Sequence, residues 1–227
     1  MMKQILIVVA LALLTVTAAS QTILNPNYGL KSPRSAELVR VNFNTGSTEV
    51  QVSITSEIDN AWFCIDRNTY IVRPDGTRLR LTGLKGLPYC PATHRFSKPG
   101  EKVTVTMTFP HTGVLPWFSI IEECGEGCLS FRGVVTDSDL NRKLDEAYAL
   151  VDKGEEAAAY SIFEQLLTES DSLNIGIEGA LFSTLVTLDR NSGRAVAARR
   201  WYEMMLTSGA PDLDLYLESL RVQGVEF

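Results

Sequence analysis

Histidine, positive charge and long apolar runs are all scarce in this sequence of 227 residues. Neither histidine, His94 or His111, lies three or four residues from another good metal ligand on a regular element, so no zinc spacing is present. Lysine and arginine total 21 against 27 aspartate and glutamate. This acidic balance, without a basic patch, disfavours nucleic acid or an anionic membrane as the main partner. We expect no metal, no cofactor and no nucleic acid.

Catalytic signatures are equally scarce. The sequence has no G-x-S-x-G nucleophile elbow. Three residues separate Cys124 from Cys128, whereas a thioredoxin-type site has two. Paired carboxylates remain open as a chemistry, because their spatial distances are invisible in a sequence. We name no catalytic residue and expect a binding protein. The alternative is an exported enzyme, or a carbohydrate- or peptide-binding protein, whose site assembles from scattered residues.

The N-terminus has the three parts of a secretory signal peptide over residues 1–20. Lys3 supplies the positive charge, residues 5–14 form an apolar run, and residues 18–20 are small. The run is short for a membrane span of about 20 residues, so an uncleaved anchor is the less favoured interpretation. We expect cleavage before Gln21, no membrane span in the mature chain, and a periplasmic or extracellular location.

Cysteine is confined to the first part of the chain, at Cys64, Cys90, Cys124 and Cys128. An even number of cysteines in an exported protein favours disulfides, and four cysteines allow three connectivities. The flexible glycines between Cys124 and Cys128 suit a short disulfide loop, which would leave Cys64 with Cys90 as the second bridge. The 99 residues after Cys128 have no cysteine, which is a first sign of two regions.

Residues 36–136 show the alternating apolar pattern of half-buried strands. The clearest rows begin at Val39, Val50 and Val103, and a turn at residues 74–76 predicts a hairpin. Seven or so short strands predict an antiparallel sandwich, with a barrel as the alternative. In the rhythm of its strands only, this region resembles the immunoglobulin-like β-sandwich domains of exported bacterial proteins. Residues 21–35 are expected to form an extended N-terminal segment.

Near Asp137 the period changes to that of helices, with Asp137 as a candidate N-cap. We predict a helical domain over residues 137–227. Its five helices are expected over residues 139–152, 155–169, 175–190, 194–207 and 212–222.

An internal repeat lies within this helical region. Residues 154–167 align without gaps with residues 193–206, and both read G-x4-A-x3-aromatic-x3-L. The pattern resembles the second half of the tetratricopeptide (TPR) repeat, in which the glycine makes the turn between paired helices and the other positions fill their interface. The resemblance covers residues 138–223, although the two glycines are 39 residues apart against a standard period of about 34.

The TPR resemblance implies that the first helix of each pair lines a concave face for a partner. The residues implied for this face are Asn141, Tyr148, Asp152, Ser183, Thr187, Arg190 and Asn191. They are mostly polar, which suits contact with a partner chain and equally suits plain solvent exposure.

Two aromatic pairs and one acidic loop are further candidates for a ligand surface. Trp62-Phe63 precedes a cysteine and Trp117-Phe118 follows a proline. Since a tryptophan beside a disulfide is common in sandwich cores, we interpret both pairs as core packing. The acidic side chains near Glu122 are interpreted as a solvated loop and not as a calcium site.

The expected fold class is α+β in two separate domains: an all-β antiparallel sandwich followed by an all-α TPR-like array of helical hairpins. The expected function is that of an exported, non-catalytic binding or scaffold protein of the cell envelope. Its partner is expected to be another exported or envelope protein.

Overall fold

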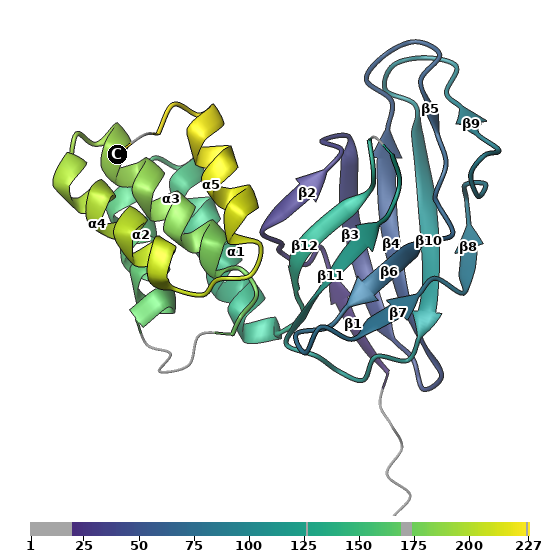
Figure 1. Cartoon of the computed structure of the whole chain (residues 1–227), viewed down its shortest axis with the longest axis horizontal. Helices are drawn as coiled ribbons and strands as arrows, with labels where there is room; N and C mark the ends of the chain where they lie inside the picture. The colour runs from purple at the N-terminus through teal and green to yellow at the C-terminus, as the bar shows by residue number, and fades with distance from the viewer. Residues whose placement is uncertain (1–19, 126, 169–173, 226) are drawn as a thin grey trace, which may run out of the picture.

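The chain changes from strands to helices near residue 136 (Figure 1). The computed structural model describes residues 20–125, 127–168, 174–225 and 227. Within these ranges the strands lie between residues 21 and 135, and the helices between residues 138 and 222. We call these regions the β part and the helical part. The expected signal peptide, apart from Ser20, lies outside the described residues.

The first sheet has the strand order β1-β3-β4-β10-β8, and all neighbouring strands are antiparallel. At its centre β4 and β10 pair along their whole length, from Thr55 opposite Lys102 to Ser47 opposite Pro110. The strands are β1 (Gln21–Leu24), β3 (Ala36–Phe43), β4 (Ser47–Thr55), β8 (Gly83–Lys85) and β10 (Lys102–Pro110).

The second sheet has the order β2-β12-β11-β6-β7 and is also antiparallel. The predicted hairpin is confirmed as β6–β7, where Gly76 adopts a φ of 80° that glycine accepts without steric cost. The strands are β2 (Leu30–Ser32), β6 (Thr69–Val72), β7 (Arg78–Arg80), β11 (Trp117–Glu122) and β12 (Ser130–Val135).

The two sheets pack face to face around one cluster of buried apolar side chains. Phe43 of the first sheet meets Phe118 of the second edge-on, with ring centroids 6.4 Å apart. Alternation predicted the inward side chains of β4 correctly. In β3 a bulge between Leu38 and Arg40 shifts the register, so that Leu38 is buried and Val39 is only half-buried. A bulge inserts one residue and changes the phase of the alternation.

The segment expected to be extended ahead of the sheets contributes a strand to each of them. β1 pairs with β3 in the first sheet, and β2 pairs with β12 in the second. The chain between them crosses from one sheet to the other, and Tyr28 on this crossing packs edge-on against Phe131 at 5.2 Å.

A separate two-stranded sheet, β5 (Trp62–Phe63) with β9 (His94–Arg95), lies at one end of the β part. Figure 1 shows this pair beyond the upper end of β10, where β4 ends and β10 begins. The chain enters the helical part from the opposite end, where the Thr136 N–H donates to the carbonyl of Pro116.

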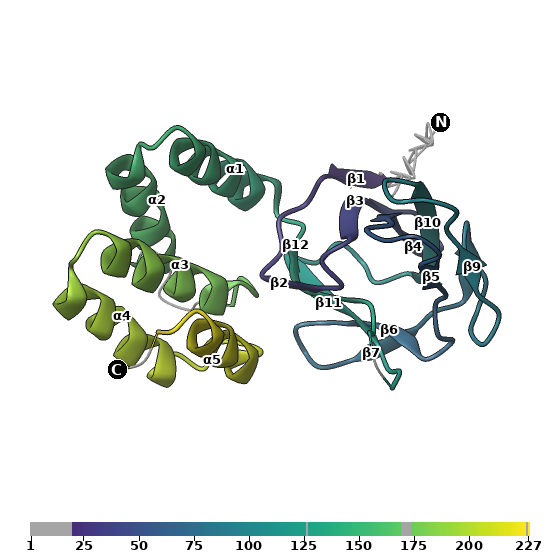
Figure 2. The ribbon, with the colours of Figure 1, turned by 90° about the horizontal axis from the view of Figure 1, so that it is seen from above.

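The helical part has five described helices at the predicted places. Asp137 is the N-cap, as expected, and its carboxylate accepts from the N–H groups of Asp139 and Leu140. Figure 2 shows the helices following one another, with α1 joined to the β part. They are α1 (Ser138–Asp152), α2 (Glu156–Thr168), α3 (Glu178–Asn191), α4 (Ala195–Thr207) and α5 (Leu213–Val222). No helix in the described ranges is long and apolar enough to cross a membrane.

The β part and the helical part meet through polar contacts and close-packed glycines. The Asn27 N–H donates to the side chain of Asn141 at 2.7 Å, and the Trp117 indole donates to the Asn174 carbonyl at 2.9 Å. Arg132 forms an ion pair with Asp212 at 2.5 Å. These contacts connect the crossing segment, β11 and β12 with α1, with the segment before α3 and with the N-cap of α5.

Four glycines let these elements approach one another. A Cβ atom on Gly179 would lie 2.3 Å from the Tyr216 ring, and one on Gly29 would lie 1.8 Å from the Tyr216 hydroxyl. The other two, Gly133 and Gly176, pack against each other and against the Trp117 ring. Side chains at Gly29, Gly133 and Gly176 would push the two parts away from each other, and one at Gly179 would push α5 away from α3.

Candidate functional site

A large hollow lies at the end of the β part that faces away from α1. It has a volume of about 630 Å³ and is lined by β5, by the segment from Cys90 to Thr93 and by the turn after β11. A smaller hollow of about 260 Å³ shares Trp62, Phe63 and Gly127 with it. We call the two hollows together the Trp62 groove.

Trp62 is the most unusual residue of this groove, because a large aromatic residue is 59% exposed there. The neighbouring Ile58 is 66% exposed. Large apolar side chains that gather on an exposed surface beside a hollow mark sites of contact with other molecules. The prediction that Trp62 packs in the core is wrong. The same prediction is confirmed for Trp117 and Phe118, which are buried.

The strand that carries Trp62 is held from several sides. It pairs with β9, where Trp62 lies opposite Arg95 and Phe63 lies opposite His94. Just beyond β9, the Phe96 N–H donates to the Ala61 carbonyl at 2.8 Å, and the Phe96 side chain is buried. The backbone that carries the exposed Trp62 side chain is therefore held in place.

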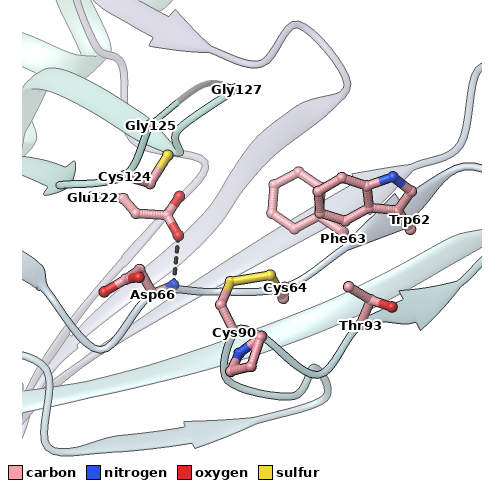
Figure 3. A pocket seen from close by; sticks show the side chains of 11 residues that line it. Trp62, Phe63, Cys64, Asp66, Cys90, Thr93, Glu122, Cys124, Gly125 and Gly127 are labelled. Atoms are coloured by element: carbon pink, nitrogen blue, oxygen red, sulfur yellow. Dashed lines mark hydrogen bonds between the residues drawn. A yellow bond between two sulfur atoms is a disulfide. The ribbon is translucent and has the colours of Figure 1, made fainter.

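Both disulfides border the groove. Sulfur atoms are bonded between Cys64 and Cys90 and between Cys124 and Cys128, as expected. The first bridge closes a separation of 26 residues, which corresponds to about 3.5 kcal/mol in the chain-entropy account. In Figure 3 the Cys64–Cys90 bridge lies between the aromatic side chains and the acidic ones. The bridges fix the walls and the floor of the groove.

Glu122 connects two of these walls. One carboxylate oxygen accepts from the Asp66 N–H at 2.5 Å, and the other accepts from the Leu129 N–H at 2.6 Å. Burial raises the pKa of Glu122, the two N–H donors oppose this shift, and the charge of Asp66 adds to it. The interpretation of Glu122 as part of a solvated loop is wrong, because only 6% of the residue is exposed. Glu126 lies outside the described residues.

Of the seven residues implied by the TPR resemblance, Asn141 and Tyr148 lie on α1 and pack against neighbouring elements. Asn141 is buried, and its side-chain amide forms hydrogen bonds with the β part. It accepts from the Asn27 N–H and donates to the Val135 carbonyl. Tyr148 packs against Phe163, with ring centroids 5.3 Å apart. Burial raises the pKa of Tyr148.

The remaining five residues lie along α3 and at the end of α1. The hydroxyls of Ser183 and Thr187 donate to carbonyls of their own helix. Arg190 donates to the Gln223 carbonyl at 3.2 Å, next to the end of α5. Asp152 and Asn191 are exposed. A role of these residues in holding a partner stays a prediction.

Neither histidine belongs to a described cluster of three or more metal-ligating side chains. His94 lies 3.8 Å from Glu101 and packs edge-on against Phe96. Among the described residues no group of three or more His, Cys, Asp or Glu side chains is arranged to hold a metal ion.

No family model matches the chain, and no curated protein or solved structure matches it either.

Proposed function

We propose that this chain is an exported, non-catalytic binding protein that holds a segment of another exported protein in the Trp62 groove. The observation that carries the proposal is Trp62 itself, which is 59% exposed between two hollows. Tryptophan is strongly enriched among the few residues that supply most of the binding energy at protein interfaces.

The rigidity of the groove supports the same function. Two disulfides, the β5–β9 pairing and the Glu122 carboxylate hold its walls in place. A site that is already ordered loses little conformational entropy when a partner binds, so more of the contact energy appears as affinity. The apolar side chains of Ile58 and Phe63 extend the contact area beside Trp62.

Export is part of the proposal and rests on two features. The sequence of residues 1–20 has the parts of a secretory signal, and both cysteine pairs are bonded. Disulfides persist in oxidising compartments and are rare in the cytosol.

We further propose that the β part and the helical part are separate domains, the first immunoglobulin-like and the second a short TPR-like array. One cluster of buried apolar residues lies within the β part and a second lies mainly within the helical part, with Val135 of β12 as its member from the β part, which supports the division. Gly154 and Gly193 both have positive φ, and Ala159 and Ala198 are both fully buried, as the repeat requires. The leucine position of the second copy differs from the pattern of a buried interface, since Leu206 is 46% exposed.

Site-specific photo-crosslinking tests the binding function. A benzophenone amino acid replaces Trp62 in one variant and Val114 in a matched control. Val114 is 60% exposed and follows β10 at the opposite end of the β part. We expect crosslinking from position 62 in the native exported fraction to give one reproducible protein adduct that position 114 does not give.

Equal adducts from positions 62 and 114 would contradict the proposal. So would glycan adducts in place of protein adducts at position 62, since these would favour the carbohydrate-binding alternative.

A further inference from the structure

The Trp62 groove has two walls of different chemistry. In Figure 3 the side chains of Trp62 and Phe63 lie on one side, and the carboxylates of Asp66 and Glu122 lie on the other. The Cys64–Cys90 disulfide lies between them. A ligand that fills the space between these walls meets an aromatic surface on one flank and negative charge on the other.

The negative charge on this wall is not neutralised within the described chain. Neither Asp66 nor Glu122 forms an ion pair with any described residue, and the charges of the two carboxylates act on each other. Arg67, next in the chain, has its guanidinium over the Tyr89 ring, 4.0 Å from the centroid. No Lys, Arg or His is among the described residues that line either hollow.

The two carboxylates differ in what they offer to a ligand. Both oxygens of Glu122 accept from backbone N–H groups, so this side chain mainly supplies charge. Asp66 is only half-buried, and its Oδ1 accepts from the Asn68 N–H at 2.7 Å. Its second oxygen has no hydrogen bond to a described residue, so Asp66 is the group that offers an acceptor to the groove.

We infer that the anchor of the bound segment is an arginine side chain flanked by apolar residues. A planar guanidinium can lie flat against an aromatic ring and, at the same time, donate to a carboxylate from its edge. The aliphatic stem of arginine adds apolar contact with the aromatic wall. Lysine carries the same charge but lacks the planar donor fork, so it fits the two walls less well.

The apolar flanks of this segment are matched by the groove rim. Pro91 is exposed beside the larger hollow, and Ile58 is exposed beside the smaller one. The inference rests on the proposed function, because it names the kind of partner segment that the Trp62 groove holds.

Peptide selection tests the anchor. The full-length chain, expressed with its leader and purified after export, is used to select binders from a random 12-residue phage-displayed library. Only clones that lose binding to the Trp62→Ala variant are kept. We expect the kept sequences to share one arginine between apolar residues.

The selected peptide is then synthesised with arginine and with citrulline, which has nearly the same shape but no charge. We expect the citrulline peptide to bind at least about 10-fold more weakly, because charge-assisted hydrogen bonds are lost. Asp66→Asn should weaken the arginine peptide about 3- to 10-fold and leave the citrulline peptide within about 2-fold.

Asp75→Asn is the matched control. Asp75 accepts from the N–H two residues ahead, as Asp66 does, but it lies in the β6–β7 turn at the other end of the β part. We expect this variant to bind like the wild type, and the urea unfolding curves of both variants check that the fold is retained.

Two other outcomes are decisive. Trp62-dependent peptides without a shared arginine would overturn the arginine anchor and leave the binding function in place. The absence of any Trp62-dependent peptide would overturn both.

Discussion

At the scale of single residues, the Trp62 groove reverses the usual placement of side chains. A large aromatic residue, Trp62, is exposed, while a carboxylate, Glu122, is buried. The buried carboxylate is stable there because each oxygen accepts from a backbone N–H. Buried charge is tolerated when it is fully hydrogen-bonded. The two residues have complementary tasks, since Glu122 fixes the loops and Trp62 meets the solvent.

Glu122→Gln is expected to destabilise the fold by about 1–3 kcal/mol. A glutamine offers one acceptor oxygen, so its amide N–H₂ would face one of the two backbone donors at Asp66 and Leu129. Urea unfolding monitored by circular dichroism measures the loss. The control is Glu123→Gln, whose exposed ion pair with Arg78 is worth at most about 1 kcal/mol. Equal losses in the two variants would contradict the bridging role of Glu122.

The sequence pattern was least informative for these two residues. Trp62 was predicted to be buried because a tryptophan beside a cysteine suits a sandwich core, and Glu122 was predicted to be exposed because it starts an acidic run. Both environments depend on how the β5–β9 pair and the β11–β12 turn close over the end of the sheets. Such closure is a tertiary event without a local sequence signal. The disulfide pairing was favoured correctly, because a short glycine-rich loop between two cysteines is a local feature.

At the scale of elements, close packing through glycine decides how the helices dock. Gly179 lies in α3, and its missing side chain makes room for the Tyr216 ring of α5. A helix loses about 1 kcal/mol when alanine is replaced by glycine in its interior. The closer approach of α5 offsets this cost, so the position is one where glycine is preferred despite its poor helix propensity.

Gly179→Ala is therefore expected to lower the free energy of unfolding by about 1–3 kcal/mol, as overpacked cores do. Helix propensity alone predicts that Gly179→Ala raises the free energy of unfolding, so the sign of the change distinguishes the two effects. The measurement is urea unfolding monitored at 222 nm. Gly46→Ala is the control, because a Cβ at Gly46 would meet no atom within 4 Å. A more stable Gly179→Ala variant would show that α5 does not depend on this contact.

The elements themselves were largely predictable. Alternation found β4 and β10, and the 3.6-residue period found all five helices, because these signals are carried by neighbours in sequence. The bulge in β3 was missed, since one inserted residue is invisible to a count of apolar positions. The strands β1, β2, β5, β8 and β9 were not predicted either. They have at most four residues, too few for a period to be recognised.

At the scale of the whole molecule, the β part and the helical part form a polar junction around a buried tyrosine. Burial raises the pKa of Tyr216, and the negative charges of Asp212 and Glu178 act in the same direction. Its hydroxyl is buried and has no hydrogen-bond partner among the described residues. The Tyr216 hydroxyl is therefore a polar group of the junction that forms no hydrogen bond to a described residue.

Tyr216→Phe is expected to leave the free energy of unfolding at pH 7 unchanged or slightly higher, because the removed hydroxyl had no partner. The difference in the free energy of unfolding between the variant and the wild type should increase above about pH 10. There the tyrosine of the unfolded chain loses its proton while the folded one keeps it, so the wild type loses stability as the pH rises. Urea unfolding at pH 7 and pH 10.5 measures both values. A loss of more than about 1 kcal/mol at pH 7 would indicate a hydrogen bond for the hydroxyl.

The pairing of β2 with β12 has a consequence for how the chain assembles. Ser32 near the N-terminus lies opposite Ser130, so the second sheet cannot close until nearly a hundred further residues are available. Pairings between distant segments slow folding and leave strand edges unpaired in the meantime. The helices that follow rest mainly on contacts between neighbours in sequence. During synthesis from the N-terminus, β2 therefore stays unpaired until β12 has been made. The strand β12 then pairs with β2 and also contacts α1, the first of the helices.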